Sequence, residues 1–394
     1  MRDKSLTRLG LIRPEELSLK VQPTFNNVGT WSLSLAYDHP LTEALRTPGG
    51  GVIITGPTDV ILSGPVVTPT FATSAQDPAG TVTFDGVSDD VVLADMLAYP
   101  DPTNPDGAHQ TLAHDVRSGP AETVIHAYVN ANVGPSAPVQ RRKAKLTMGA
   151  NLGRGPTVSK SARFPVLGNL LAEIAVVADL GFRVIQRDDV LVFETYLVSD
   201  KSREIRLDTR TGTLSGQKVA ISPPGVTRAI VAGQGDLTER QFLEVDTAES
   251  LAAEVAWGRR IEQFIDQRQT DDWNELQQAG DEAMANSGFT SVAVQAIPME
   301  DSVMEFGHDW YLGDKVTVVV EDQELASTAT GMSLLADSNG FKIGALLGDA
   351  SGFDPQVALS KRVQNTETRV SQLEQNVSAA DPQDDQIMRI MGVY

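Results

Sequence analysis

Few side chains in this sequence could carry catalysis or bind a metal. It holds five histidines and no cysteine, which excludes disulfides, thiol nucleophiles, Cys-ligated zinc and iron–sulfur clusters. His109 and His114 lie five residues apart, whereas metal-binding helices place two histidines four apart so that both rings share one face. This spacing favours polar surface residues over the alternative, a metal site.

The patterns of nucleophilic and phosphate-binding sites are also absent from the sequence. It contains no Gly-x-Ser-x-Gly turn and no Gly-x-x-x-x-Gly-Lys-Ser/Thr loop. The glycine-rich run 149–155 predicts a turn with positive φ. Acid pairs such as Asp89-Asp90 could serve a glycosidase, but a chain with 52 Asp and Glu supplies such pairs by chance. We therefore expect no catalytic residues, no cofactor, no bound metal and no enzyme activity.

The overall charge excludes further classes of function. The 394 residues carry a net charge of −20, which repels duplex phosphates and anionic lipids and disfavours DNA wrapping or a membrane-surface role. No apolar run approaches the ~20 residues that span a bilayer. The N-terminus lacks the apolar region of a signal peptide. We expect a protein made in the cytoplasm, not exported by a cleavable signal and without a membrane span.

One stretch reverses this charge. No carboxylate lies between Glu122 and Glu173, whereas residues 236–286 hold thirteen acids against four bases. Three interpretations are open for the basic stretch: an interface with the acidic region, a solvated surface, or a nucleic-acid contact. The first is favoured, because the stretch lacks the interleaved aromatics typical of nucleic-acid binding. The candidate interface residues are Arg141, Arg142, Lys143, Lys145, Arg154, Lys160 and Arg163.

The elements that must position these residues are mostly short strands between Gly- and Pro-rich turns. In residues 1–100, apolar side chains alternate over 17–21 and 31–35, which predicts two strands. Three more strands are expected before a helix at Val91–Tyr99. The Pro-rich loop 100–107 then predicts a domain boundary.

Residues 110–212 predict a mixed α+β unit, with helices near 120–129 and at Val166–Ala178 and a hairpin turned at 187–189. Residues 215–350 return to strands. A helical insert at about 248–286 is expected there, formed by helices Ala248–Asp266 and Asp271–Ala285.

The last stretch has a different pattern. Six residues follow a 4-3-4-3-4 spacing, as at the a and d positions of a coiled coil, whereas a lone amphipathic surface helix is the alternative. An isolated helix of this length is marginal in water, which favours self-association. We predict a coiled-coil helix over 356–379 and a C-terminal tail over 380–394. The a/d seam consists of Leu359, Val363, Thr366, Val370, Leu373 and Val377.

A series of short motifs follows a characteristic order through residues 5–350. They occupy residues 27–31 (NVGTW), 115–124 (DVRSGPAETV), 128–130 (YVN), 181–184 (GFRV), 233–235 (GQG), 257–262 (WGRRIE) and 312–316 (LGDKV). This order resembles that of the siphovirus minor tail proteins that form the baseplate hub, a family common in phages of actinobacteria. The motifs are structural rather than catalytic.

The resemblance implies a fold, a β-rich multidomain α+β chain. Two tail-tube-like β-barrel domains would occupy 1–100 and 215–350, with the mixed insert domain between them. Three subunits would form a pseudo-hexameric ring, the trimeric hub that joins the sixfold tail tube to threefold tip proteins and lines the DNA exit channel. An acidic chain suits a lumen along which DNA slides.

The resemblance also implies partners and a location. The partners would be further copies in a homotrimer, a distal tail or tail-tube protein, and tip or receptor-binding proteins. The tape measure protein and DNA in transit during genome ejection would pass through the lumen. The protein would be a structural component of the virion tail tip, assembled in the host cytoplasm. The alternative is a tail-tip adhesin or lysin that binds or degrades the host cell wall. Aromatics make up only 6% of the chain and form no sugar-binding cluster, so this alternative is weaker.

Overall fold

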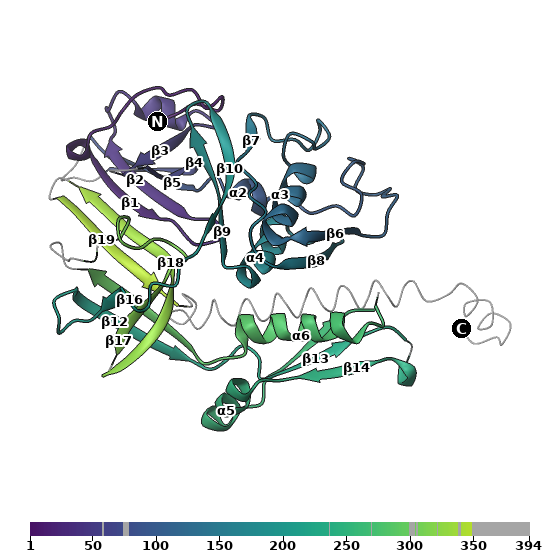
Figure 1. Cartoon of the computed structure of the whole chain (residues 1–394). Helices are drawn as coiled ribbons and strands as arrows, with labels where there is room; N and C mark the ends of the chain where they lie inside the picture. Colours follow the sequence, from purple (N-terminus) through teal and green to yellow (C-terminus); the bar gives the residue numbers. More distant parts are fainter. Residues whose placement is uncertain are drawn as a thin grey trace, which may run out of the picture.

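The computed structural model describes residues 1–348 except 57–58, 74–78, 236, 269, 299–303, 305, 321 and 338–339. The predicted coiled-coil helix and the tail over 380–394 lie outside the described residues. Within the described part, no helix is long and apolar enough to cross a membrane. The chain is β-rich with few helices, and its strands form several sheets (Figure 1).

The N-terminal unit is a strand-rich layer whose apolar side chains alternate as the sequence predicts. Trp31, Leu33 and Phe84 point to one buried face. The predicted helix at Val91–Tyr99 is wrong beyond its first turn, because Leu97 forms a β-bridge with Val166. The elements are η1 (Pro14–Glu16), β1 (Leu17–Gln22), β2 (Thr30–Ala36), α1 (Thr42–Arg46), β3 (Gly51–Thr55), β4 (Val60–Ala72), β5 (Thr81–Val87) and α2 (Val91–Ala94).

The middle domain packs two helices against a small sheet of order β7-β10-β9, and a second sheet pairs β6 with β8. Ile125, Leu171 and Phe193 are buried in its core. Both predicted helices and the predicted hairpin turn at 187–189 are confirmed. The elements are β6 (Asp115–Pro120), α3 (Ala121–Asn132), β7 (Leu146–Met148), β8 (Thr157–Ala162), α4 (Leu167–Val177), β9 (Leu180–Arg187) and β10 (Val190–Leu197).

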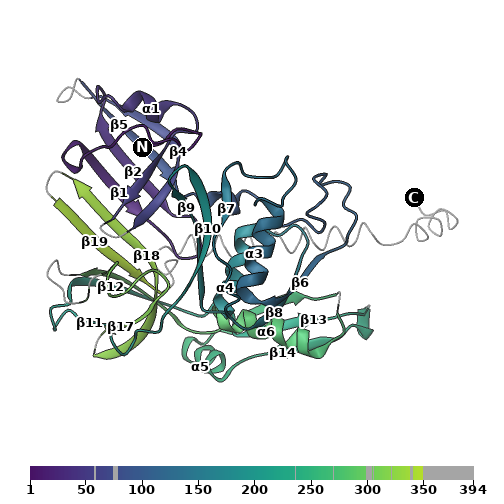
Figure 2. The ribbon, with the colours of Figure 1, turned by 45° about the horizontal axis from the view of Figure 1, so that its top comes forward.

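Between β12 and β16 the chain forms an inserted subdomain beside the C-terminal strands, in which α6 covers a three-stranded sheet of order β14-β13-β15 (Figures 1 and 2). The C-terminal strands are β11 (Arg206–Leu207), β12 (Leu214–Ser222), β16 (Ser291–Pro298), β17 (Lys315–Val320), β18 (Gln323–Asp337) and β19 (Gly340–Leu347). The inserted elements are β13 (Arg228–Ala232), η2 (Leu237–Glu239), β14 (Phe242–Val245), α5 (Ala248–Trp257), β15 (Glu262–Asp266) and α6 (Trp273–Ser287).

The predicted helix Ala248–Asp266 is wrong in its second half. Gly258 adopts a left-handed conformation with φ of 60°, which ends α5 and satisfies its last carbonyls. The following residues form β15, which pairs in parallel with β13. The insert is therefore a small α/β subdomain rather than a helical hairpin.

The strands of the two ends form one sheet, which corrects the expectation of two separate β-barrels. Its order is β12-β16-β19-β18-β1-β2-β5-β4-β3, and β17 and β11 branch from β18. The reason is the length of β18: its first half pairs with β17, while its second half continues to β1. No closed ring of paired strands occurs within the described residues. In Figure 1, β18 and β19 (yellow-green) accordingly run beside β1 (purple).

Candidate functional site

A cavity of about 1210 Å³ lies where the N-terminal unit, the β9–β10 hairpin and the C-terminal unit meet. Its apolar wall includes Leu62, Phe182, Leu334 and Ile343. Charged side chains from β9, β10 and the loop before β4 also line it. The cavity therefore borders all three parts of the fold, and the contacts around it decide how these parts are held together.

Side chains of the N-terminal unit satisfy the outer edge of β9. The backbone N–H groups of Phe182, Val184 and Gln186 point away from β10. Phe182 donates to the Asn26 side-chain oxygen (2.8 Å), Val184 to the Asp90 carboxylate (2.6 Å) and Gln186 to the Ser63 hydroxyl (2.7 Å). The three acceptors do what a neighbouring strand would do for an edge. We call this set of contacts the β9 junction.

Asn26 acts most like a peptide group in the β9 junction. Its amide nitrogen donates to the Leu180 carbonyl (3.0 Å), while its oxygen accepts from Phe182. Asn26 has φ of 50°, a conformation that Asn tolerates better than most residues. The asparagine thus combines a tight turn after β1 with a contact to a strand more than 150 residues away.

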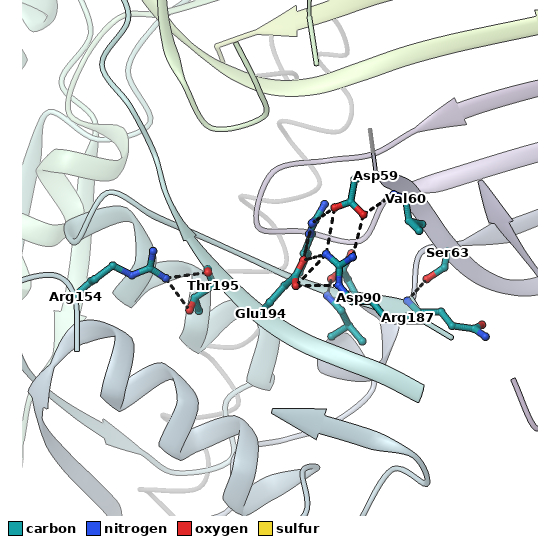
Figure 3. Close-up of polar contacts among 11 residues, drawn as sticks. Asp59, Val60, Ser63, Asp90, Arg154, Arg187, Glu194 and Thr195 are labelled. Carbon is teal, nitrogen blue, oxygen red and sulfur yellow. Dashed lines mark hydrogen bonds and ion pairs between the residues drawn. The ribbon is translucent and has the colours of Figure 1, made fainter. Parts of the chain in front are cut away.

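Asp90 is the titratable member of the junction (Figure 3). Burial raises the pKa of its carboxyl group to about 7, although hydrogen bonds from the Val184 N–H and the Ser88 hydroxyl stabilise the ionised form. Ser88 does not cap α2; its hydroxyl donates to Asp90, the residue at the helix N-cap.

An ion cluster lies next to Asp90 at the cavity (Figure 3). Arg187 contacts Asp59 (3.0 Å) and Glu194 (3.0 Å), and Arg183 contacts the same two acids. The hydrogen bond from Arg187 is the main reason that the pKa of Asp59 falls to about 2. Because Asp59 precedes β4 and Glu194 lies on β10, the two arginines of β9 connect the N-terminal unit to the middle domain.

A buried ion pair anchors the start of the chain to the same strand. Arg2 donates twice to Asp89, at 2.6 and 2.8 Å, and once to the Gln186 side-chain oxygen at 2.8 Å. The Arg2 and Asp89 side chains are each 4% exposed. Ser63 donates to the same carboxylate, so its hydroxyl serves both this pair and the β9 junction.

A second buried carboxylate organises the middle domain. Glu122 at the start of α3 is fully buried and accepts hydrogen bonds from the side chain and backbone N–H of Arg154, the Leu152 N–H and the Thr195 hydroxyl. Burial alone would raise the pKa of Glu122, but these donors outweigh it and lower the pKa to about 2. Figure 3 shows the further contact of Arg154 with Thr195 on β10.

The seven predicted interface bases do not act as one group. Lys160 reaches the acidic region, at 2.8 Å from Glu282 on α6, and also contacts Glu173 at 3.3 Å. Arg154 pairs with Glu122, Lys145 with Asp189, and Arg141 stacks on the Tyr99 ring. The Arg142 side chain donates to a backbone carbonyl. Lys143 and Arg163 are exposed and form no ion pair within the described residues.

Replacing Lys160 tests the contact between the inserted subdomain and the middle domain. We expect Lys160→Met to leave Glu282 unpaired and to raise the amide exchange rate of α6, while α3 keeps its protection. Hydrogen exchange measures both helices at once. Arg163→Met removes an exposed base from the same stretch and should change neither, and an unchanged α6 in Lys160→Met would contradict the expectation.

The histidines form no site in the described part of the chain. His109 is exposed and contacts Asp106 at 2.8 Å within its own loop. His126 packs edge-on against Phe193, and burial lowers its pKa. Among the described residues, no group of three or more His, Asp or Glu side chains is placed to hold a metal. The cavity is instead bordered by ion pairs and by side chains that accept hydrogen bonds from the β9 backbone, and such contacts can hold domains in place.

Sequence patterns did not identify the β9 junction. Asn26 and Ser63 have no periodic pattern, and the acid pair Asp89-Asp90 was indistinguishable from chance pairs. One signal was present: Asn26 immediately precedes the NVGTW motif, and Phe182, Arg183 and Val184 belong to the GFRV motif. In the fold, Asn26 beside the first motif bonds to Phe182 of the second motif.

Comparisons with known proteins agree with this architecture. Residues 1–349 match the family model described as Siphovirus ReqiPepy6 Gp37-like protein. A 43 kDa tail protein of prophage MuSo2 from Shewanella oneidensis is similar in structure, with a TM-score of 0.53 and 11% identity over 86% of this chain and 96% of that one. A search of curated proteins finds no match.

Two further tail-protein structures are similar. The tail protein from Neisseria meningitidis MC58 gives a TM-score of 0.51 and 11% identity over 86% of this chain and 93% of the other. Prophage tail protein gp18 from Listeria monocytogenes EGD-e gives a TM-score of 0.50 and 10% identity over 90% of this chain and 95% of the other. At these identities the likeness concerns the fold.

Proposed function

Because the chain belongs to the Siphovirus ReqiPepy6 Gp37-like protein family and has the fold of phage tail proteins, we propose that it is the trimeric hub of a siphophage tail tip. In this proposal three copies form a ring that joins the sixfold tail tube to threefold tip proteins. The ring surrounds the channel through which DNA leaves, with the tape measure protein in the lumen before ejection.

The observation that carries this proposal is the sheet shared by the two ends of the chain. Pairing of β1 with β18 places strands of the N-terminal and C-terminal units side by side in one subunit. Each subunit therefore supplies two strand-rich units to a ring. Three subunits supply six, which matches a sixfold tube on one side while the ring keeps threefold symmetry for the tip.

One face of this sheet has the character of a channel wall. The cross-strand register places six side chains in a row on the face opposite the core: Lys342, Leu335, Lys20, Ser32, Asp85 and Thr68. Hydroxyl-bearing residues continue this face, as where Ser34 meets Thr83 at 2.8 Å. Apart from the exposed Leu335 the row is polar, and its two lysines are partly balanced by Asp85, so the face stays hydrated without a strong positive charge that would hold passing DNA.

The other half of the proposal is self-association through the predicted coiled-coil helix. We expect the full chain to have the mass of three subunits of 42.2 kDa each in solution. Val at a and Leu at d favour dimers on their own, so the threefold order would come from the ring. Light scattering behind size-exclusion chromatography measures this mass directly, and a monomer at high protein concentration would contradict it.

Paired substitutions separate the role of the a/d seam from charge effects. We expect Val370→Lys with Leu373→Lys to place like charges on the helix axis and to shift the trimer towards monomer, without unfolding residues 5–350. Burial of each side chain against its symmetry mates contributes roughly 1.5–3 kcal/mol. Ser371→Lys with Gln375→Lys adds the same charge on the outer side and should stay trimeric. A Val370→Lys, Leu373→Lys variant that remains trimeric would show that the a/d seam does not drive self-association.

A further inference from the structure

The β9 junction differs from the rest of the fold in which groups accept hydrogen bonds from its backbone N–H groups. Elsewhere the two large units are joined by strand pairing, as between β1 and β18. At β9, single side chains replace a whole strand, and two of them, Ser63 and Asp90, border the cavity. This edge can open without unfolding either unit, since the strands on both sides remain paired with their own neighbours; the ion pairs of Asp59 with Arg183 and Arg187 and the contact of Arg2 with Gln186 open with it.

We propose that the β9 junction is a pH-dependent latch between the N-terminal unit and the middle domain, closed when Asp90 is protonated and weakened when it ionises. The geometry behind it is a half-buried carboxyl group whose acceptor role at Val184 survives protonation, held between β9, the loop before α2 and the apolar side of the cavity. It goes beyond the proposed hub function, because it concerns motion within one subunit.

The charged groups around Asp90 leave its ionised form without a free counterion. On its own loop, Asp89 is occupied by Arg2. On β9, Arg183 is shared between Asp59 and Glu194. Arg187 is engaged by the same two acids.

Further titratable groups line the cavity around the junction. They are Tyr196, Lys201, His308 and Asp314, with Tyr311 beside them. Lys201 donates to the Asp309 carbonyl and contacts Asp314 at 3.8 Å, and the His308 ring contacts Asp309 at 2.9 Å. Lys201 and the His308 ring therefore each have another acidic or carbonyl partner.

The direction of the pH effect follows from the two states of the latch. In the closed state the pKa of Asp90 is about 7, whereas an open latch would return it towards its ordinary value of 3.8. The closed state therefore holds the proton more tightly. Its advantage is fully present below the open-state pKa and is lost as the pH rises through about 7. From pH 5 to pH 7 we expect the open population to rise on the order of tenfold or more.

Hydrogen exchange of the purified full chain tests the latch. The expected result is that the protection factor of the Val184 amide, after correction for intrinsic exchange, falls on the order of tenfold or more between pH 5 and pH 7. The amide of Val129 in the core of α3 should keep its protection, which distinguishes latch opening from global unfolding.

Two variants make the test specific to Asp90. Asp90→Asn keeps an acceptor for the Val184 N–H but does not titrate, so its protection should not vary with pH. Asp85→Asn removes an acid from the exposed sheet face and should behave as the wild type. Asn26→Ala weakens the junction without touching its titrating group, so protection should drop at every pH while the pH dependence remains. A Val184 protection factor independent of pH, or an equal pH dependence in Asp90→Asn, would overturn the proposal.

Discussion

Glu122→Ala is expected to abolish the folded middle domain or to cost about 3–5 kcal/mol of its stability. The substitution leaves the Arg154 guanidinium without its carboxylate partner and frees the Leu152 and Arg154 N–H groups that now donate to Glu122. It also removes the acceptor of the Thr195 hydroxyl, which connects α3 to β10. Denaturant unfolding, followed with a probe placed in the middle domain, measures the loss in its free energy of unfolding.

A control variant and the pH dependence of stability test whether the effect is specific to Glu122. Glu173→Ala removes an acid whose side chain is 53% exposed and pairs with Lys160, so it should cost about 1 kcal/mol or less. The pH dependence of stability gives an independent test of the role of Glu122. The pKa of Glu122 is lowered to about 2, so its contribution is present above about 4.5 and is lost as the pH falls towards 2. Equal costs for the two alanine variants would contradict the role assigned to Glu122.

Arg2→Met is expected to produce the second large effect, again about 3–5 kcal/mol, because the buried Asp89 carboxyl group would lose its ion-pair partner and retain only the Ser63 hydroxyl as a side-chain donor. The loss should concentrate at the contact of the chain start with β9, where Gln186 also loses a donor. Thermal unfolding at neutral pH gives the change in stability.

A double variant distinguishes a lost ion pair from lost packing. Removing both charges with Arg2→Met and Asp89→Asn should recover much of the stability, since a buried pair replaced as a whole is often close to neutral. Arg8→Met removes an exposed arginine from the same segment and should have little effect. Failure of the double variant to exceed Arg2→Met in stability would show that the charge of Asp89 is not the cause.

Local patterns predicted the elements well where neighbours along the chain decide the structure. Alternation of apolar residues over 17–21 and 31–35 marks β1 and β2, because one face of each strand is buried. Helical spacing predicted α4, and two turn-forming acids predicted the β9–β10 hairpin. The errors lie at ends of elements, as in the helix that stops at Gly258.

Contacts between distant segments could not be read from periodicity. The pairing of β1 with β18 brings together residues more than 300 positions apart, and nothing in the pattern of either strand names its partner. The same holds for the β9 junction, where one Asn, one Asp and one Ser each satisfy a backbone group of a distant strand. Family resemblance supplied the tail-protein fold, but it suggested two closed barrels where the strands form one open sheet.

The basic stretch shows why charge along the sequence is a weak guide to an interface. Seven bases without an intervening acid suggested one surface, yet Arg154 turns inward to Glu122 and Arg141 stacks on Tyr99. Only Lys160 joins the acidic α6 among the ion pairs of the described residues. Because folding distributes neighbouring residues to different faces, a charge run predicts a partner only after the strand and loop directions are known.

A cryo-electron microscopy reconstruction of the assembled tail tip is the most direct test of the proposed hub. The account predicts three copies of this chain in a closed ring, with the row that contains Lys20, Ser32 and Asp85 turned towards the central axis. A sixfold or single-copy position for the chain, or a ring in which that row faces outward, would contradict it.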